Sequence, residues 1–389
     1  MTNETIKSKE QQRIAIVGAG PGGLTLARIL QQHGIKTVIY EREASPSARQ
    51  QGGSLDIHHD SGQWALSEAG LLEQFKALAR YEGEDFRLLD KTGKVYMDEI
   101  AEPDGGGRPE IDRGTLRELL LNSIDPNCIR WGHKLDQAVA LENGMYELHF
   151  ENGQIETYDL VVGADGAFSR IRPLLTDSVP AYSGLSMVEL YLDNVAVAHP
   201  EIAAFNRRGK LFALSDHKGI VGQLNGDGRI CVYAAFRVEQ EWLDTCGIPF
   251  DQPEQAKDQL LEHFHDWNET LRNYIQSADG PMLPRRIYML PTGLKWTHKP
   301  GVTLIGDAAH LMSPFAGEGV NMAMLDAAEL ALSIVKHTDI NKAVEAYEEK
   351  MYNYSSESAQ ESYDNLELCF SDDAASKLAA LMNSYHEQP

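Results

Sequence analysis

A glycine-rich segment near the N-terminus constrains the fold of this chain more than any other feature. The segment, Gly18-Ala19-Gly20-Pro21-Gly22-Gly23, follows the apolar run 14–17 and precedes a stretch with helical spacing at 24–32. Gly34 is a natural end for that helix, and the β-branched run 37–40 returns as a second strand. This order predicts a βαβ unit whose first turn binds the pyrophosphate of a dinucleotide at a helix N-terminus.

The residues expected at this turn have separate physical roles. Gly18 permits the tight turn out of the strand, Gly20 lets backbone N–H groups approach the pyrophosphate, and Gly23 allows the helix to pack close to the sheet. Glu41 closes the second strand, where an acid accepts a hydrogen bond from a ribose 2′-hydroxyl; the alternative is a solvated acid at a strand end. The candidate cofactor-binding residues in this part of the chain are Gly18, Gly20, Pro21, Gly23, Glu41 and Arg42.

A second glycine motif, late in the chain, distinguishes FAD from NAD. An apolar run leads into Gly306-Asp307-Ala308-Ala309-His310, and Pro314-Phe315-Ala316-Gly317-Glu318-Gly319 and Asn321 follow. Asp307 at the carboxyl end of a strand can hold sugar hydroxyls, and Gly317 and Gly319 let the backbone lie against the isoalloxazine edge. A helix begins just after, and its N-terminal N–H groups would stabilise a reduced, anionic flavin. A capped helix start alone would not need this density of Gly, Pro and Asp. No His or Cys is placed for a flavin linkage, so the FAD is expected to be noncovalent.

The central part of the chain changes character. Segment 181–280 consists of short alternating runs separated by Gly, Asn and Asp turns, which predicts an antiparallel sheet roofing a substrate pocket. Later, 323–336 reads as a buried helix and 342–370 as a long helix lying across the domains. The expected fold is α/β, with a Rossmann-like FAD-binding domain, an antiparallel-sheet substrate domain and a long C-terminal helix. The expected boundaries are 1–80, 102–180 and 281–338 for the FAD-binding domain, 81–101 and 181–280 for the substrate domain, and 339–389 for the helical segment.

Charge and cysteine content exclude several classes of partner. The chain has 35 Lys and Arg against 58 Asp and Glu, a net charge of −23, which repels nucleic acid and anionic lipid. No apolar run is long enough to span a membrane, and the polar segment 1–12 lacks the apolar part of a signal peptide. The 4 scattered cysteines form no CxxC pair, which indicates a reducing cytoplasm and argues against a disulfide enzyme or a zinc site.

Three histidines are interpreted as non-catalytic. His310 follows the late motif on an apolar stretch, and we expect it to be structural. His58 and His59 are expected at the surface or supporting the site from behind, because no third ligand stands at metal spacing. The sequence therefore predicts no metal site.

Together these motifs resemble those of the class A flavoprotein monooxygenases, which share the fold of para-hydroxybenzoate hydroxylase and its GR2-type FAD-binding domain. Segment 159–172 resembles the family motif in which the aspartate, here Asp165, serves both FAD and nicotinamide binding. Within the family, the chain is most similar to the tetracycline-inactivating monooxygenases. That similarity lies in Ser47-Ala48-Arg49, Gly52-Gly53-Ser54-Leu55-Asp56, Pro109-Glu110-Ile111-Asp112-Arg113 and 306–317.

The resemblance implies roles for individual residues. Arg49 would meet NADPH, and Asp56, Arg113 and Asp307 would contact FAD. Read without the resemblance, a surface arginine is usually just solvated. The absence of a second GxGxxG argues against the Baeyer–Villiger type, and the absence of Trp-x-Trp-x-Ile-Pro argues against a flavin halogenase.

The resemblance also implies a reaction. NADPH reduces FAD, O₂ adds at the flavin C4a, and the resulting hydroperoxide hydroxylates an electron-rich carbon of a polycyclic or phenolic aromatic. The cofactor does the chemistry, so no protein residue is expected to act as acid or base. The alternatives are a flavin oxidoreductase of the same fold that inserts no oxygen, and a protein that binds FAD or a drug without turnover. We expect a cytoplasmic monomer with no nucleic-acid, membrane or metal partner.

The expected substrate site lies between the late motif and the sheet. Pro314, Phe315 and Gly317 would position the substrate from below. The expected roof residues are Glu189, Lys210, Phe212, Val221, Cys231 and Tyr233, although Phe212 and Tyr233 could equally be core. Tetracycline is the first candidate substrate, and the roof departs from the tetracycline-inactivating enzymes. Lys210 stands near an arginine of theirs, Glu189 near a glutamine, and Cys231 and Tyr233 near a histidine and a glycine.

Overall fold

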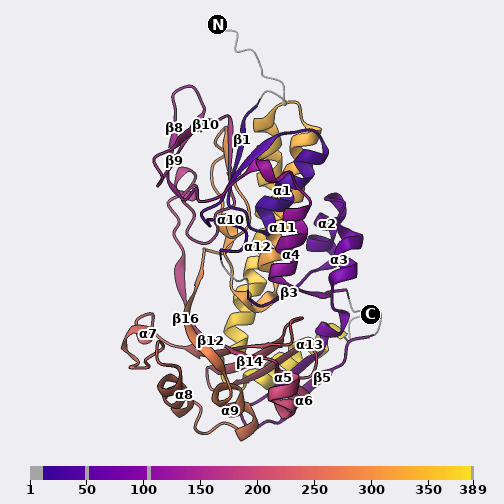
Figure 1. Cartoon of the computed structure of the whole chain (residues 1–389), viewed down its shortest axis with the longest axis vertical. Coiled ribbons are helices and arrows are strands. Elements are labelled where there is room, and N and C mark those ends of the chain that lie inside the picture. The colour runs from indigo at the N-terminus through magenta and orange to yellow at the C-terminus, as the bar shows by residue number, and fades with distance from the viewer. Residues whose placement is uncertain (1–11, 49–51, 103–106, 387–389) are drawn as a thin grey trace.

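The computed structural model describes residues 12–48, 52–102 and 107–386. It is elongated, with a parallel sheet and its helices at one end and a seven-stranded sheet at the other (Figure 1). Arg49, expected to meet NADPH, lies outside the described residues. Two long strands and a long helix join the two ends (Figure 1).

The parallel sheet is built from the predicted apolar runs. Its order is β17 (Val302–Leu304), β11 (Leu160–Gly163), β1 (Ile14–Val17), β2 (Thr37–Tyr40) and β7 (Ile129–Arg130), and every pair is parallel. Strands from three distant parts of the chain therefore end at the same edge. β17 ends at Leu304, because the chain turns away at Gly306, which has φ +61°.

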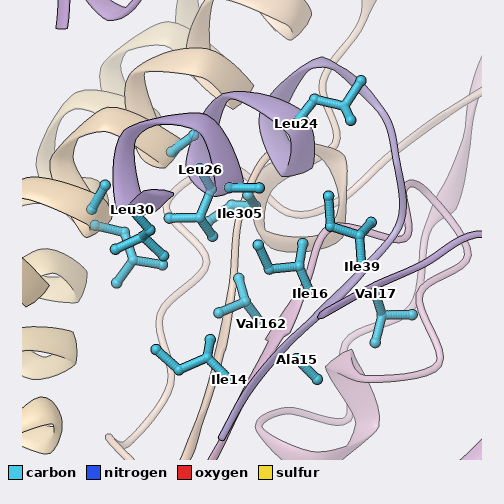
Figure 2. Packing of buried hydrophobic residues seen from close by; sticks show 14 of the residues in the cluster. Ile14, Ala15, Ile16, Val17, Leu24, Leu26, Leu30, Ile39, Val162 and Ile305 are labelled. Atoms are coloured by element: carbon cyan, nitrogen blue, oxygen red, sulfur yellow. The ribbon is translucent and has the colours of Figure 1, made fainter. Parts of the chain in front are cut away.

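Helix α1 (Pro21–Gln32) covers this sheet and begins at Pro21, earlier than the expected 24. Pro at the first turn of a helix lacks only an N–H that would have no helical partner. Its side chains Leu26 and Leu30 face the strand residues Ile14, Ile16 and Val162 (Figure 2). All five are at most 2% exposed, so the βαβ unit has a dry apolar core.

Smaller elements surround the parallel sheet. A three-stranded antiparallel sheet contains β10 (Ile155–Tyr158), β9 (Tyr146–Phe150) and β8 (Leu135–Ala140), and β3 (Ser54–Asp56) pairs with β6 (Glu110–Asp112). The helices here are α2 (Trp64–Glu68), α3 (Leu72–Leu78), α4 (Arg113–Asn122) and α10 (Asp307–His310). Short helical turns lie at η2 (His59–Gln63), η3 (Tyr81–Glu84), η4 (Pro126–Cys128), η5 (Arg172–Leu174) and η6 (Pro314–Ala316).

The seven-stranded sheet is the expected roof. Its order is β16 (Asp279–Met289), β12 (Ala181–Leu192), β15 (Ile230–Arg237), β14 (Lys218–Leu224), β13 (Lys210–Ser215), β4 (Phe86–Leu89) and β5 (Val95–Glu99). All pairs are antiparallel except β13 with β4, which is parallel. β16 crosses the boundary expected at residue 280. Pro281 and Pro284 obscure this strand in the sequence, and an edge strand tolerates proline because one row of its N–H groups is unpaired.

The two faces of this sheet bury different clusters. One face packs against α5 (Val195–Ala198), α6 (Pro200–Asn206), α7 (Trp242–Thr245), α8 (Pro253–Glu262) and α9 (Glu269–Gln276). The other face meets α13 (Ala374–His386) and the end of α12 (Ile340–Cys369), with Leu214, Ala235 and Phe370 in one cluster. This second face is the one directed toward the parallel sheet.

The C-terminal helices tie the two ends together. α11 (Glu318–Lys336) packs on α1, and α12 packs on α11. α12 begins at Ile340, before the expected 342, because the Asp339 side chain accepts a hydrogen bond from the Asn341 N–H and caps the helix. The helix runs from the parallel sheet down to the seven-stranded sheet (Figure 1). No helix in the described part of the chain has the length and apolar character needed to cross a bilayer.

Candidate active site

The glycine turn between β1 and α1 leaves backbone exposed and space beside it. Gly18 has φ +113°, and a Cβ there would lie 2.2 Å from the Ala164 carbonyl oxygen. A Cβ at Gly23 would lie 2.2 Å from the Gly18 carbonyl oxygen, whereas one at Gly20 would meet nothing within 4 Å. Among the described residues, no side chain caps the N-terminus of α1. The turn thus combines two positions closed to any side chain with an open one beside free helical N–H groups, which suits an anion.

Glu41 holds this turn in place. Its carboxylate is buried and accepts hydrogen bonds from the N–H groups of Ala19 at 2.8 Å and Glu43 at 2.9 Å. Glu41 is therefore not the solvated acid at a strand end that was the alternative interpretation. Its bond to a ribose stays a prediction, and so does any contact of Arg42, whose side chain is exposed.

The late motif is braced by one buried carboxylate. Asp326 Oδ2 lies 2.7 Å from both the Gly306 N–H nitrogen and His310 Nε2, and Asp326 Oδ1 accepts from the Tyr354 hydroxyl at 2.6 Å. Burial lowers the pKa of His310, but the Asp326 carboxylate raises it overall. His310 is buried and paired in this network, as the sequence predicts for a structural residue.

Two further acids, Asp165 and Asp307, lie at the edge of the parallel sheet and can accept additional hydrogen bonds. Asp165 accepts from the Arg170 N–H at 2.7 Å, but its Oδ1 is buried without a hydrogen-bond partner among the described residues. The Asp307 carboxylate makes no hydrogen bond to a described residue, and burial raises its pKa while Arg113 and Arg172 act in the opposite sense. Buried carboxylate oxygens normally have a partner, so Asp165 fits a ligand rich in hydroxyl groups. Asp307 is half-buried and can accept from the same ligand at its accessible edge.

Arg172 is a site residue that the sequence reasoning missed. Its guanidinium is buried and donates to the Ala308 carbonyl at 3.0 Å and the Ala167 carbonyl at 2.6 Å. It therefore joins the central motif to the late motif. The signal in the sequence was an arginine between Ile171 and Leu174, in a stretch otherwise suited to burial.

Asn321 connects α11 to the loop that carries Asp56. Its amide donates to the carbonyls of Asp56 at 2.9 Å and Gly317 at 3.0 Å, and its oxygen accepts from the His58 N–H at 2.9 Å. These bonds make Asn321 a positioning residue for the turn before α11. Its expected contact with the cofactor stays a prediction.

Gly317 is required by close approach. It has φ +70° at the N-terminus of α11, and a Cβ would lie 2.8 Å from Asp56 Oδ2. A Cβ on Gly319 would come within 3.9 Å of Asp307 Oδ1. No side chain caps α11. Gly317, Gly319, Asp56 and Asp307 therefore lie together at a helix N-terminus, and Pro314 beside them is exposed.

A chain of charges runs from this turn to the seven-stranded sheet. Lys210 Nζ lies 2.8 Å from Glu110 Oε1 and 3.3 Å from Asp56 Oδ2. His58 Nε2 lies 3.3 Å from Asp56 Oδ2, and His58 Nδ1 lies 3.1 Å from Glu318 Oε1. Burial raises the pKa of Asp56, but Lys210 and His58 hold it well below its usual range. His58 is buried behind the site and His59 is exposed.

The strand register puts the expected roof residues on one face of the sheet. Phe212 is opposite Val221, Val221 is opposite Tyr233, and Tyr233 is opposite Glu189. Lys210 and Cys231 lie in the next row on the same face, on either side of Gln223. A Cβ on Gly53 would lie 3.6 Å from the Tyr233 hydroxyl, so this face meets the loop before Asp56.

Not every roof residue is open to a ligand. Phe212, Tyr233 and Phe315 border the same apolar cluster and are only partly buried. Cys231 is fully buried, and burial raises its pKa to about 12. Tyr191 and Gln223 lie in the same row of this face as Cys231, and Glu110 pairs with Lys210. Sequence reasoning missed them because they become neighbours only through strand pairing.

A glycine turn suited to an anion, two acids at the sheet edge and the N-terminus of α11 lie together below a separate roof. This fold and site, with the family match that follows, are those of a class A flavin monooxygenase. A family model described as "FAD binding domain" matches residues 11–123 and 149–362. The chain belongs to that family, binds FAD and is an FAD-dependent monooxygenase.

Known proteins are similar to this chain in sequence and in fold. Monooxygenase asqM of Emericella nidulans is 33% identical, over 96% of this chain and 98% of its own. The structure of Klebsiella pneumoniae HpxO complexed with FAD and uric acid has a TM-score of 0.80 and 18% identity, covering 99% of this chain and 95% of that one. The tetracycline destructase Tet(55) has a TM-score of 0.75 and 21% identity, covering 98% of this chain and 96% of that one.

Proposed function

We propose that this monooxygenase uses NADPH and O₂ to hydroxylate a polycyclic or phenolic aromatic, acting as a monomer. The observation that carries the proposal is the position of Phe212, Tyr233 and Phe315. These three rings border one apolar cluster where the sheet approaches the turn that carries Gly317. Partly buried aromatic rings near a few fixed polar groups are typical of a site for a flat apolar ligand.

The residues of the chain would hold and shield the reactants. The turn 18–23 and the N-terminus of α1 suit the pyrophosphate, and Asp165 and Asp307 suit sugar hydroxyls. The free N–H groups at the start of α11 would stabilise negative charge on the flavin ring. Bound FAD supplies the activation of O₂ and the oxygen transfer. The aromatic cluster would keep water away from that chemistry.

Tetracycline is the first substrate to test. We expect tetracycline to fit this roof differently from the way it fits the tetracycline-inactivating enzymes, because Lys210 is already paired with Asp56 and Glu110. A lysine also lacks the planar fork with which an arginine binds a diketone edge. The four cysteines are free thiols, which supports a reducing compartment.

The test is incubation of the FAD-loaded protein with NADPH, air and a panel of phenols, polyketides and tetracyclines. We expect ligand-stimulated NADPH oxidation and a product heavier by one oxygen atom by mass spectrometry. NADPH oxidation that yields only H₂O₂ with tetracycline removes tetracycline as a substrate. If panel compounds stimulate NADPH oxidation and are converted to products without added oxygen, the oxidoreductase alternative is favoured. If no compound stimulates NADPH oxidation, a binding protein is favoured.

A further inference from the structure

Four acidic side chains lie where the seven-stranded sheet meets the loop 52–58. Glu110 is 2% exposed, and the side chains of Asp56, Glu189 and Glu318 are 20%, 12% and 16% exposed. A Cβ on Gly52 would come within 3.9 Å of Glu189 Oε1. All four acids therefore lie at the boundary between the roof and the loop that carries Asp56.

The cations at this boundary are already engaged. Lys210 lies between Asp56 and Glu110, at 3.3 and 2.8 Å. Arg285 donates from Nε to Glu189 Oε2 at 3.0 Å, and Glu189 Oε1 accepts from the Tyr191 hydroxyl. Arg285 is also 54% exposed, so solvent screens part of its charge.

His58 is the third basic side chain at this boundary, and it contacts two acids. It contacts Asp56 and Glu318, and its pKa is raised by them against the effect of burial. Glu318 Oε2 is nevertheless buried and has no hydrogen-bond partner among the described residues. These four carboxylates therefore have three basic partners among the described residues, Lys210, Arg285 and His58. Arg80 also reaches this loop through the Ser54 hydroxyl, but it is itself paired with Asp112 at 2.8 Å.

This balance discriminates between charged ligands. An anionic ligand would approach carboxylates that already outnumber their partners. To be paired itself, it would have to draw Lys210 away from Asp56 and Glu110, leaving buried charge uncompensated. A neutral phenol or amide avoids that cost, and a ligand ammonium can add the missing positive charge.

We propose that the site accepts neutral or cationic aromatic molecules and rejects aromatic carboxylates, with Glu189 as the specificity-determining residue of the roof. This inference rests on the proposed function and names the charge class of its substrate. Glu189 is the best residue to test. It faces the loop from the sheet, and replacing it with glutamine keeps the size and the acceptor oxygen while removing the charge.

The experiment compares three ligands of one shape on the FAD-loaded protein: 2-naphthol, 2-naphthylmethylammonium and 2-naphthoate. Dissociation constants are measured by titration calorimetry and by the change in flavin absorbance. We expect naphthol and naphthylmethylammonium to bind at least about tenfold more tightly than naphthoate, because each charge interaction in a partly buried site changes affinity by about that factor or more. Glu189→Gln should tighten naphthoate binding several-fold relative to naphthol.

The matched control is Glu73→Gln. Glu73 lies on α3 with its side chain 82% exposed, beside Lys76, so the same charge is removed away from the site. It should leave the ratio of the two dissociation constants unchanged. Naphthoate binding as tightly as naphthol, an unchanged ratio in Glu189→Gln, or no binding of any ligand would each overturn the inference. An oxygenated product formed preferentially from naphthoate would overturn it while upholding the proposed function.

Discussion

The side-chain amide of Asn321 donates to the backbone carbonyl of Asp56 at 2.9 Å, although the two residues are 265 positions apart in the chain. The same amide holds Gly317, and its oxygen receives the His58 N–H. One side chain therefore fixes the loop after β3 against the N-terminus of α11. At that junction the turn before α11 meets the loop that lies against the seven-stranded sheet.

Asn321→Ala should weaken this junction. It leaves the buried His58 N–H and two carbonyls without their partner, and each unpaired group costs about 1–3 kcal/mol. We expect a lower denaturation midpoint and a lower FAD content in the purified protein. Asn353→Ala is the control, because Asn353 also donates its amide to a carbonyl but on the exposed side of α12. Equal midpoints and FAD contents for the two variants would rule out the positioning role.

Asp307→Ala should lose most of the cofactor. A sugar hydroxyl left without its acceptor costs about 1–3 kcal/mol, which corresponds to a dissociation constant for FAD roughly 5- to 150-fold higher. The measurement is titration of the apoprotein with FAD followed by flavin fluorescence. Asp307→Asn retains one acceptor oxygen, so its dissociation constant for FAD should lie between those of Asp307→Ala and the wild type. Full FAD occupancy in Asp307→Ala would remove this residue from the site.

Arg172→Lys should not be a conservative change. The guanidinium reaches the Ala167 and Ala308 carbonyls together, and an ammonium lacks that rigid fork. We expect a destabilisation of about 1–3 kcal/mol by urea denaturation, because a buried carbonyl loses its donor. Arg170→Lys, on an exposed neighbour, provides the comparison and should lie close to the wild type. Indistinguishable urea midpoints would mean that the two motifs do not depend on Arg172.

Arg49→Ala tests a residue known only from the sequence. The resemblance implies that its charge meets NADPH, so KM for NADPH should rise while the flavin content stays near normal. Steady-state kinetics with flavin quantified in the same samples separates the two effects. An unchanged KM would return Arg49 to an ordinary solvated arginine.

His58 should make stability depend on pH in a defined direction. Its pKa in the folded protein is raised above the usual 6.5, so its contribution is fully present below that value and is lost as pH rises through the folded pKa. The free energy of unfolding should therefore fall between about pH 6 and the higher, folded pKa. His58→Gln should show a smaller fall over the same range in urea denaturation. An identical slope in the variant would show that His58 does not carry this linkage. The pKa of His310 is also raised. Because His310 is present in both proteins, its contribution is the same in both and does not affect the comparison.

The cofactor half of the molecule was predictable from sequence because its signals are local. A strand, a glycine turn and a helix follow one another within a short segment, and Gly23 is required by its close approach to the Gly18 carbonyl in that same segment. The late motif is read the same way. The structural part played by His310 followed from its position on an apolar stretch.

The roof and the charge network were decided by tertiary structure. Lys210 and Glu189 were recognised as roof residues, but their partners Asp56, Glu110 and Arg285 come from other strands and loops. Pairing between distant segments depends on sheet order and register, which alternating hydrophobicity does not specify. The crossing of residue 280 by β16 has the same origin, because only pairing with β12 reveals that proline-bearing segment as a strand.

The sequence by itself therefore determined that the chain builds a dinucleotide turn and a flavin-binding motif, since a strand, a glycine turn and a helix in direct succession are local signals. Only the folded chain decided that Asn321 braces Asp56, that Arg172 joins two motifs, and that Lys210 is neutralised. Those contacts depend on where whole strands and helices pack, and a side chain finds its partner only after that packing exists.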